Sequence, residues 1–390
     1  MASAITRELA ALTLGHYPAF VYRDGAGLTG EDYVPVFCFH TLEPGDFDDR
    51  LRYLSGNGYR TVTLDEVYAW MREGEPLPDR PVVLTIDDGR LSTWAVGYPL
   101  LRKHGLLATA FIIPGYVTDG APRPTLEDVW EDRASIEDVS APESIDRCTM
   151  VNWAEVEIMH GSGVMNIESH SMFHRRVPVS TRLAGFITPA AQGPIFEVPM
   201  DPGARQPWTP DRLHAALGTP LFESVPLMST ASVCPVPPQV IDACTELVRH
   251  EGEAGFFIRP DWHETLRRTI DWKELHRVRP VNSGPDQSWE LAASKEEIER
   301  RLPGRAVRHF CYPNGRGTER TGALSAGAGY RTCCWNLLPA GETNRRGCDA
   351  TRIGRLKHDF VYRLPGDGRR SLMSILTGKF HRRRLGDTGY

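Results

Sequence analysis

Short apolar runs alternate with helix-like segments through most of this chain, and no other feature constrains the fold as strongly. The runs are rich in Val, Ile and Phe, which is typical of buried strands. Strands are expected at residues 34–40, 81–86, 106–114, 164–169, 307–315 and 329–335. Amphipathic segments that stop at glycine predict helices at residues 47–58, 94–105, 153–163 and 294–304. Strand–helix–strand alternation predicts parallel strands with crossover helices, and therefore an α/β barrel or a doubly wound sheet.

The middle of the chain breaks this rhythm at about residues 178–286, which carry many prolines and mix aromatic with polar segments. Helices are still expected there, at residues 240–252 and 262–277. We therefore predict an N-terminal extension over residues 1–33 and a main domain over residues 34–390, which this insertion interrupts. The sequence leaves open whether the insertion packs beside the site or covers it as a lid.

Composition and charge limit the kinds of molecule that the protein is expected to bind and the cellular compartments in which it is expected to work. The formal net charge of −5 gives no sign of a nucleic-acid-binding protein. No apolar stretch is long enough for a membrane span, and the N-terminus lacks the pattern of a secretion signal. The eight cysteines include no CxxC pair, which argues against a disulfide scaffold or a structural zinc site and suits a reducing compartment. We therefore expect a cytoplasmic protein.

Two adjacent carboxylates, Asp87 and Asp88, end the apolar run PVVLTI. Neighbouring acids repel each other unless a positive group lies beside them. His170 and His174 follow another expected strand at a spacing of four residues, which on a helical turn places both imidazoles on one face. Because the carboxyl ends of parallel strands gather on one face of such folds, these pairs can meet there. Two histidines and one carboxylate with open positions are typical of a catalytic zinc or similar divalent metal site.

The chain resembles the polysaccharide deacetylases of the NodB-homology type, also called carbohydrate esterase family four. TIDDG (85–89) is similar to that family's T-F-D-D-G motif, and HSMFH (170–174) to its second motif, H-S/T-x-x-x-H or the shorter H-S/T-x-x-H. FCYPNG (310–315) looks like the F-A-Y-P-Y-G text of the subgroup that acts on poly-N-acetylglucosamine. The resemblance covers roughly residues 34–177 and 290–356. It implies a distorted (β/α)7-type barrel with a large insertion.

The resemblance also implies roles for individual residues. Asp88, His170 and His174 would ligate a divalent metal, most simply Zn²⁺, with Co²⁺, Ni²⁺ or Mn²⁺ as alternatives. Asp87 would be the general base. A divalent metal lowers the pKa of a water molecule beside it, and the carboxylate next to the metal-binding Asp88 could take the proton of that water. The backbone N–H of Tyr312 would help to hold the oxyanion.

The general acid is less well defined, because the family's late L-x-H motif is not obvious in this chain. His40 ends an expected strand and matches a histidine near the start of the poly-N-acetylglucosamine subgroup, whereas His358 lies near the place of the late histidine. We favour His40, because it ends a strand as the expected metal ligands do. By the same resemblance, Arg352 matches a late R-I and would orient Asp87 through an ion pair.

The activity implied is metal-dependent removal of an N-acetyl group from an amino sugar or N-acetylated glycan. One alternative is hydrolysis of another amide, such as a formamide on a lipid-linked sugar or a cyclic amide. Another is a carbohydrate-binding protein without catalysis, although the retention of Asp87 and all three expected ligands argues against it. The apolar and then basic segment 371–384 could touch an anionic membrane surface, but a solvated helix is favoured.

Overall fold

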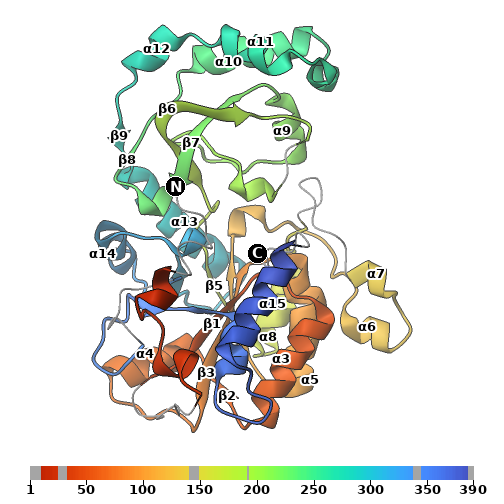
Figure 1. Ribbon diagram of the computed structural model, residues 1–390, viewed down its shortest axis with the longest axis vertical. Coiled ribbons are helices and arrows are strands. Elements are labelled where there is room, and N and C mark those ends of the chain that lie inside the picture. Colours follow the sequence, from red (N-terminus) through yellow and green to blue (C-terminus); the bar gives the residue numbers. More distant parts are fainter. Residues whose placement is uncertain (1–9, 25–32, 140–148, 191–192, 337–343, 385–390) are drawn as a thin grey trace.

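The computed structural model of the protein describes residues 10–24, 33–139, 149–190, 193–336 and 344–384. Figure 1 shows a parallel sheet with helices around it and, above it, a smaller part that the predicted insertion forms.

Parallel strands form the central sheet, in the order β12-β11-β10-β5-β4-β3-β1-β13. Their bounds are β1 (Val36–Phe39), β3 (Pro81–Asp88), β4 (Ala108–Ile112), β5 (Met165–Ser169), β10 (His309–Cys311), β11 (Thr332–Trp335), β12 (Ile353–Gly354) and β13 (Leu356–Lys357). The short β2 (Arg60–Thr61) pairs beside β3. Parallel strands need crossover connections, which explains the helices between them.

One extended segment lies between the two ends of this sheet. β12 pairs with β11 and β13 pairs with β1, and Arg355 alone separates β12 from β13. The same stretch of backbone therefore adjoins both end strands and closes the sheet into a barrel. The predicted barrel is confirmed, and the doubly wound sheet is excluded.

Side chains alternate across each strand, so one set fills the barrel and the other faces the helices. β3 is buried along its whole length, as expected of a strand covered on both faces. The interior cluster contains Val36, Val83, Phe111, Cys311, Cys334 and Ile353, together with apolar residues of α4 (Leu64–Arg72). Outward residues such as Phe37 and Leu84 belong to the larger core shared with the surrounding helices. These include α3 (Pro44–Gly56), α5 (Tyr98–His104), α8 (Trp153–Gly161), α13 (Gly284–Arg301) and α14 (Glu319–Gly327).

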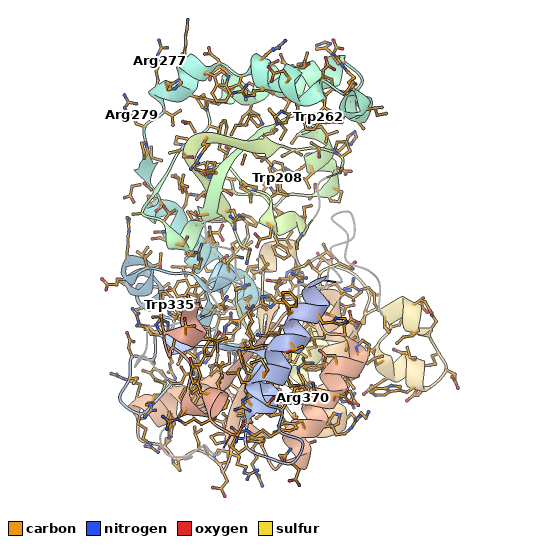
Figure 2. All side chains as sticks on the ribbon, in the orientation of Figure 1. Trp208, Trp262, Arg277, Arg279, Trp335 and Arg370 are labelled. Atoms are coloured by element: carbon orange, nitrogen blue, oxygen red, sulfur yellow. The ribbon has the colours of Figure 1, made fainter. Side chains whose placement is uncertain are left out.

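The insertion differs from the barrel in having antiparallel strands. Its long ribbon pairs β6 (Arg176–Phe186) with β7 (Pro220–Pro226), and a smaller one pairs β8 (Ser232–Val233) with β9 (Val281–Asn282). The helices α9 (Pro210–Ala215), α10 (Pro238–His250), α11 (Trp262–Thr269) and α12 (Trp272–Arg277) pack around a core of their own. That core also contains Ile113, Tyr116 and Phe173 of the barrel, so the two parts share apolar contacts. Figure 2 shows Trp208 and Trp262 in the insertion and Trp335 in the barrel.

Two predicted helices differ from the observed ones. The single helix expected at residues 262–277 is broken into α11 and α12, because the Asp271 side chain accepts from the N–H groups of Lys273 and Glu274 and starts a new helix. The helix expected at residues 294–304 is the second half of α13, which begins earlier, with Pro285 in its first turn.

Both ends of the described chain pack on the barrel. Phe20 and Val21 of α2 (Ala19–Tyr22) are buried, and the Arg363 side chain donates to the carbonyl of Val21. The C-terminal α15 (Leu372–Arg384) buries Ile375 in the main core and places the Lys379 ammonium over the Phe360 ring. Among the described residues, no helix combines the length and apolar character that a bilayer crossing requires.

Candidate active site and metal-binding residues

The candidate site lies where β3 and β5 end, and its backbone is unusual. Asp88, Ser171 and His174 have φ values of 75°, 66° and 52°, in the left-handed region that side chains rarely adopt. Residues held in such conformations cluster at functional sites, where the surrounding structure enforces them. After Asp88, only glycine fits at position 89: its φ is 76°, and an added Cβ would lie 3.0 Å from Cγ2 of Ile112.

The structure brings Asp88, His170 and His174 together as a possible set of ligands. One ligand atom of each residue lies within 4.8 Å of the others, and all three side chains are buried. The two imidazole centroids are 5.0 Å apart. The spacing of the two histidines predicts a helical turn, and that prediction is wrong. Residues 170–174 form a non-helical turn after β5. The positive φ of Ser171 and His174 bends this turn so that both rings face Asp88.

The chemistry of this set fits a divalent metal. Nδ1 of His170 lies 2.8 Å from the carbonyl oxygen of Cys311, so it carries the proton and leaves Nε2 free, 3.5 Å from Oδ1 of Asp88. Nδ1 of His174 is buried and has no hydrogen-bond partner among the described residues, although Oε1 of Glu197 lies 3.3 Å away. Two imidazoles and one carboxylate match the ligands of zinc and similar ions.

A buried arginine neutralises Asp88. Nε of Arg90 donates to Oδ2 of Asp88 over 2.9 Å. Burial would raise the pKa of Asp88, but the Arg90 guanidinium and the His170 ring outweigh it and hold that pKa well below its usual range. The Asp88 carboxylate is therefore ionised at neutral pH, as a metal ligand must be.

Asp87 points into the barrel, where the guanidinium group of Arg355 donates a hydrogen bond to each of its two carboxylate oxygens. Nη1 and Nη2 of Arg355 donate to Oδ1 and Oδ2 over 2.6 and 2.8 Å, and both side chains are almost fully buried. The Sγ atoms of Cys38 and Cys311 lie 3.5 and 3.6 Å from Oδ2. Burial raises the pKa of both thiols well above the usual range, so they are neutral donors. For Asp87, burial is outweighed by Arg355 and His170, so its pKa is lowered and the carboxylate is ionised.

The ion pair expected of Arg352 is thus made by Arg355. The guanidinium of Arg352 instead lies over the ring of Trp335, 5.4 Å from its centroid. The alternation of side chains explains the difference: Ile353 and Arg355 both point into the barrel, and Arg352 has the opposite parity. The same alternation could have found Arg355 in the sequence, once the segment 353–357 was recognised as a strand.

His40 and His358 occupy different environments. Nε2 of His40 lies 3.7 Å from Oδ2 of Asp87. Burial lowers the pKa of His40 to about 4, against the attraction of Asp88 and Asp87. The ring of His358 stacks on Phe39 in the layer that faces the helices, and burial lowers its pKa to about 4 as well. Between the two candidates for the general acid, it is His40 that contacts Asp87.

The N–H of Tyr312 is already engaged. It donates to the carbonyl of Cys334 over 3.2 Å, within the ladder between β10 and β11. The Tyr312 ring lies on the outer side of the barrel, with its centroid 4.6 Å from that of Trp335. This geometry does not offer the oxyanion donor that the resemblance implied, because the N–H already donates to the carbonyl of Cys334 on the neighbouring strand.

The insertion contributes two residues that the motifs did not indicate, both from the short helical turn Ile195–Glu197. The Phe196 ring meets the His174 ring edge-on, with centroids 5.1 Å apart. Glu197 approaches His174 and also accepts from Nδ2 of Asn314 over 3.0 Å. The insertion therefore covers the candidate site on the side of His174.

A buried ion pair fixes the turn that carries the histidines. Oε2 of Glu290 on α13 accepts from the N–H of Phe173 over 2.9 Å, and Nη2 of Arg175 lies 3.0 Å from Oε1. Both side chains are essentially inaccessible to solvent. Glu290 and Arg175 thus fix the position of the turn. The contact between Glu290 and Phe173 joins residues that are more than a hundred positions apart in the sequence.

Comparison with known proteins supports the motifs. Residues 74–186, which include both motifs, match the sequence profile of the family described as polysaccharide deacetylase. The poly-beta-1,6-N-acetyl-D-glucosamine N-deacetylase of Escherichia coli (strain K12) is 28% identical over 142 residues, or 36% of this chain and 19% of that protein. The protein of the same name from Staphylococcus aureus (strain N315) is 22% identical over 132 residues, or 34% of this chain and 37% of that one.

Among solved structures, the deacetylase domain of BpsB from Bordetella bronchiseptica has a TM-score of 0.47 and 17% identity, over 84% of this chain and 96% of that one. The matches to the curated relatives span well under half of those proteins' own length.

Proposed function

Because residues 74–186 carry the signature of the polysaccharide deacetylase family, we propose that the protein hydrolyses the N-acetyl amide of amino sugars in a glycan. The observation that supports this most strongly is the separation of two adjacent carboxylates. Asp88 faces His170 and His174, whereas Asp87 faces Arg355 and His40. The first group has the composition of a metal site, and the second provides a base beside it.

A divalent ion bound by Asp88, His170 and His174 would polarise the amide carbonyl and make water more acidic. Asp87 takes a proton from the attacking water, with Arg355 fixing the direction of its carboxylate. His40 is neutral near pH 7 and lies beside Asp87, so it can receive a proton and pass it to the leaving amine. The arginine keeps Asp87 ionised between turnovers.

Acetate release from a β-1,6-linked oligomer of N-acetylglucosamine, before and after chelation, tests this function. We expect chelator treatment to abolish release, and Zn²⁺ to restore it, with Co²⁺, Ni²⁺ and Mn²⁺ compared in parallel. Activity that survives exhaustive chelation would contradict the metal site. Release of formate from a formylated amino sugar, without acetate release, would favour the deformylase alternative. Chelator-insensitive glycan binding without turnover would favour a binding protein.

Glu197→Gln should weaken metal binding by about 10–100-fold, because carboxylates that contact a ligating histidine orient it and raise its basicity. The measurement is competition with a chromophoric chelator, which needs no turnover. Glu223→Gln is a matched control, since its side chain is 31% exposed against 32% for Glu197 and it pairs with Arg182 on the β-ribbon. Equal affinity in wild type and Glu197→Gln would show that the insertion does not support the metal.

A further inference from the structure

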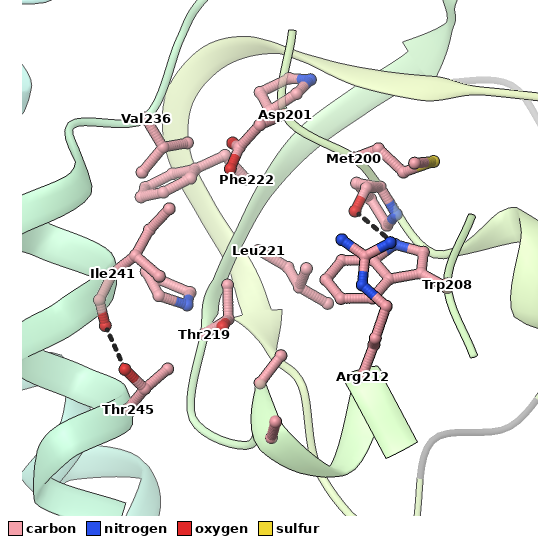
Figure 3. Close-up of a pocket in the computed structure, with 15 residues that line it drawn as sticks. Met200, Asp201, Trp208, Arg212, Thr219, Leu221, Phe222, Val236, Ile241 and Thr245 are labelled. Atoms are coloured by element: carbon pink, nitrogen blue, oxygen red, sulfur yellow. Dashed lines mark hydrogen bonds between the residues drawn. The ribbon is translucent and has the colours of Figure 1, made fainter. Parts of the chain in front are cut away.

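The insertion contains a cavity of about 320 Å³. Its walls come from the β6–β7 ribbon, α9, α10 and the segment that leads from Pro199 to Trp208 (Figure 3). None of the candidate catalytic or metal-binding residues lines it. Its volume lies at the lower end of the range for small-molecule sites, about 300–1,000 Å³, and suits a single sugar unit.

Trp208 is a fixed aromatic wall of this cavity. Its Nε1–H donates to the carbonyl of Pro199 over 3.2 Å, and its backbone N–H donates to the Tyr116 hydroxyl over 3.3 Å. The Arg212 guanidinium lies 5.7 Å from the centre of the ring. A flat ring with restricted rotation offers a stacking surface to the apolar C–H face of a pyranose at little cost in side-chain entropy.

The other residues that line the cavity form a polar part and an apolar part. The Asp201 carboxylate has no ion pair or hydrogen bond with any other described side chain, and the Arg212 side chain is exposed and donates only to the carbonyl of Pro207. These groups can accept from and donate to sugar hydroxyls. Figure 3 shows Val236 and Ile241 across the cavity from Trp208. With Phe222 they form an apolar wall suited to the methyl group of an acetamide.

The cavity is connected to the candidate active site by a short piece of backbone. Glu197 lies against His174, and Met200, three residues further on, lines the cavity. Three residues span at most about 11 Å. The N–H of Met200 donates to the carbonyl of Arg176, which fixes this piece to the strand that follows the histidine turn.

We propose that this cavity binds an N-acetylhexosamine unit of the glycan other than the unit that is hydrolysed. The inference rests on the proposed function for the identity of the glycan, but the binding itself does not require catalysis. It assigns to the insertion a role in selecting oligomeric over monomeric substrates, with Trp208 as the stacking platform and Asp201 and Arg212 as hydroxyl partners.

The test compares a β-1,6-linked pentamer of N-acetylglucosamine with the monomer, using the full chain. Trp208→Ala should lower kcat/KM for acetate release from the pentamer about tenfold or more and leave kcat/KM for the monomer unchanged. Calorimetric binding of the pentamer to chelator-treated protein should weaken by a similar factor. Trp208→Phe should restore most of the binding, and Arg212→Gln, on an exposed side chain, should weaken it without affecting folding. Trp130→Ala, at a ring 48% exposed on the barrel, is the control that should change nothing.

The outcomes separate this inference from the proposed function. If wild type hydrolyses the pentamer and Trp208→Ala and Arg212→Gln do so equally well, the sugar site is wrong and the function stands. If no acetate is released but pentamer binding depends on Trp208 and Arg212, the site stands and the function is wrong. Tighter binding of the fully deacetylated pentamer than of the acetylated one, or binding of a medium-chain fatty acid in place of the pentamer, would overturn the assignment.

Discussion

Asp87→Asn is expected to lower kcat for acetate release by about 10²–10⁴-fold, the usual contribution of a general base. Asparagine has nearly the shape of aspartate but cannot take a proton from water. Asp88, His170 and His174 are untouched, so metal affinity should change much less than kcat. The measurement is the rate of acetate release at saturating metal, with metal binding followed separately by chelator competition.

The control for this variant must separate chemistry from folding. Asp87→Asn leaves the Arg355 charge buried without its partner, so some loss of stability is expected. The double variant Asp87→Asn/Arg355→Met removes both charges and should recover stability while remaining inactive. Asp49→Asn, at a side chain 57% exposed on α3, should behave as wild type in every assay. Full activity in folded Asp87→Asn would contradict the role of this carboxylate.

Arg355→Met is expected to destabilise the protein by about 3–5 kcal/mol, because it strands a buried carboxylate that two guanidinium hydrogen bonds now satisfy. Burial raises the pKa of Asp87, and Arg355 is the leading group that opposes it. Without the arginine this pKa should rise, so the base is protonated over a wider acidic range. The acid limb of the kcat/KM profile should therefore move to higher pH. Urea unfolding and the pH–rate profile measure the two effects.

Arg352→Met is the matched control, since it removes an arginine from the same segment. The Arg352 guanidinium lies over Trp335, and its loss should cost little stability and leave the pH profile in place. The opposite result, with Arg352→Met shifting the profile and Arg355→Met leaving it unchanged, would mean that Asp87 is oriented as the family resemblance implied and not as in this structure.

The insertion changes how the site can be understood. Phe196 and Glu197 approach His174 from outside the barrel, and the chain between them and Trp208 lines a separate cavity. The variants at Glu197 and Trp208 test the two parts of the insertion independently. Glu197→Gln is measured by metal affinity, and Trp208→Ala by the preference for an oligomer over the monomer.

Much of the barrel could be predicted from local pattern. Buried parallel strands are apolar on both faces, so PVVLTI and LLATAFIIP are recognisable without their neighbours. Local pattern does not reveal the closing segment, because β12 and β13 are each only two residues long and form no recognisable apolar run. Their strand character comes from pairing with β11 and β1, which local sequence does not report.

Local sequence pattern is enough to place two carboxylates at the end of one strand and two histidines after another, and hence to predict that they meet at one end of a barrel. The charged side chains that contact these residues are set by long-range folding. Arg355 reaches Asp87 because the chain closes the barrel 268 residues later, and Glu290 holds the histidine turn from a helix 117 residues beyond Phe173. The histidine pair meets through left-handed backbone at Ser171 and His174 and not through a helix. Spacing along a chain predicts contacts within one element, whereas these contacts join elements that only the closed barrel brings together.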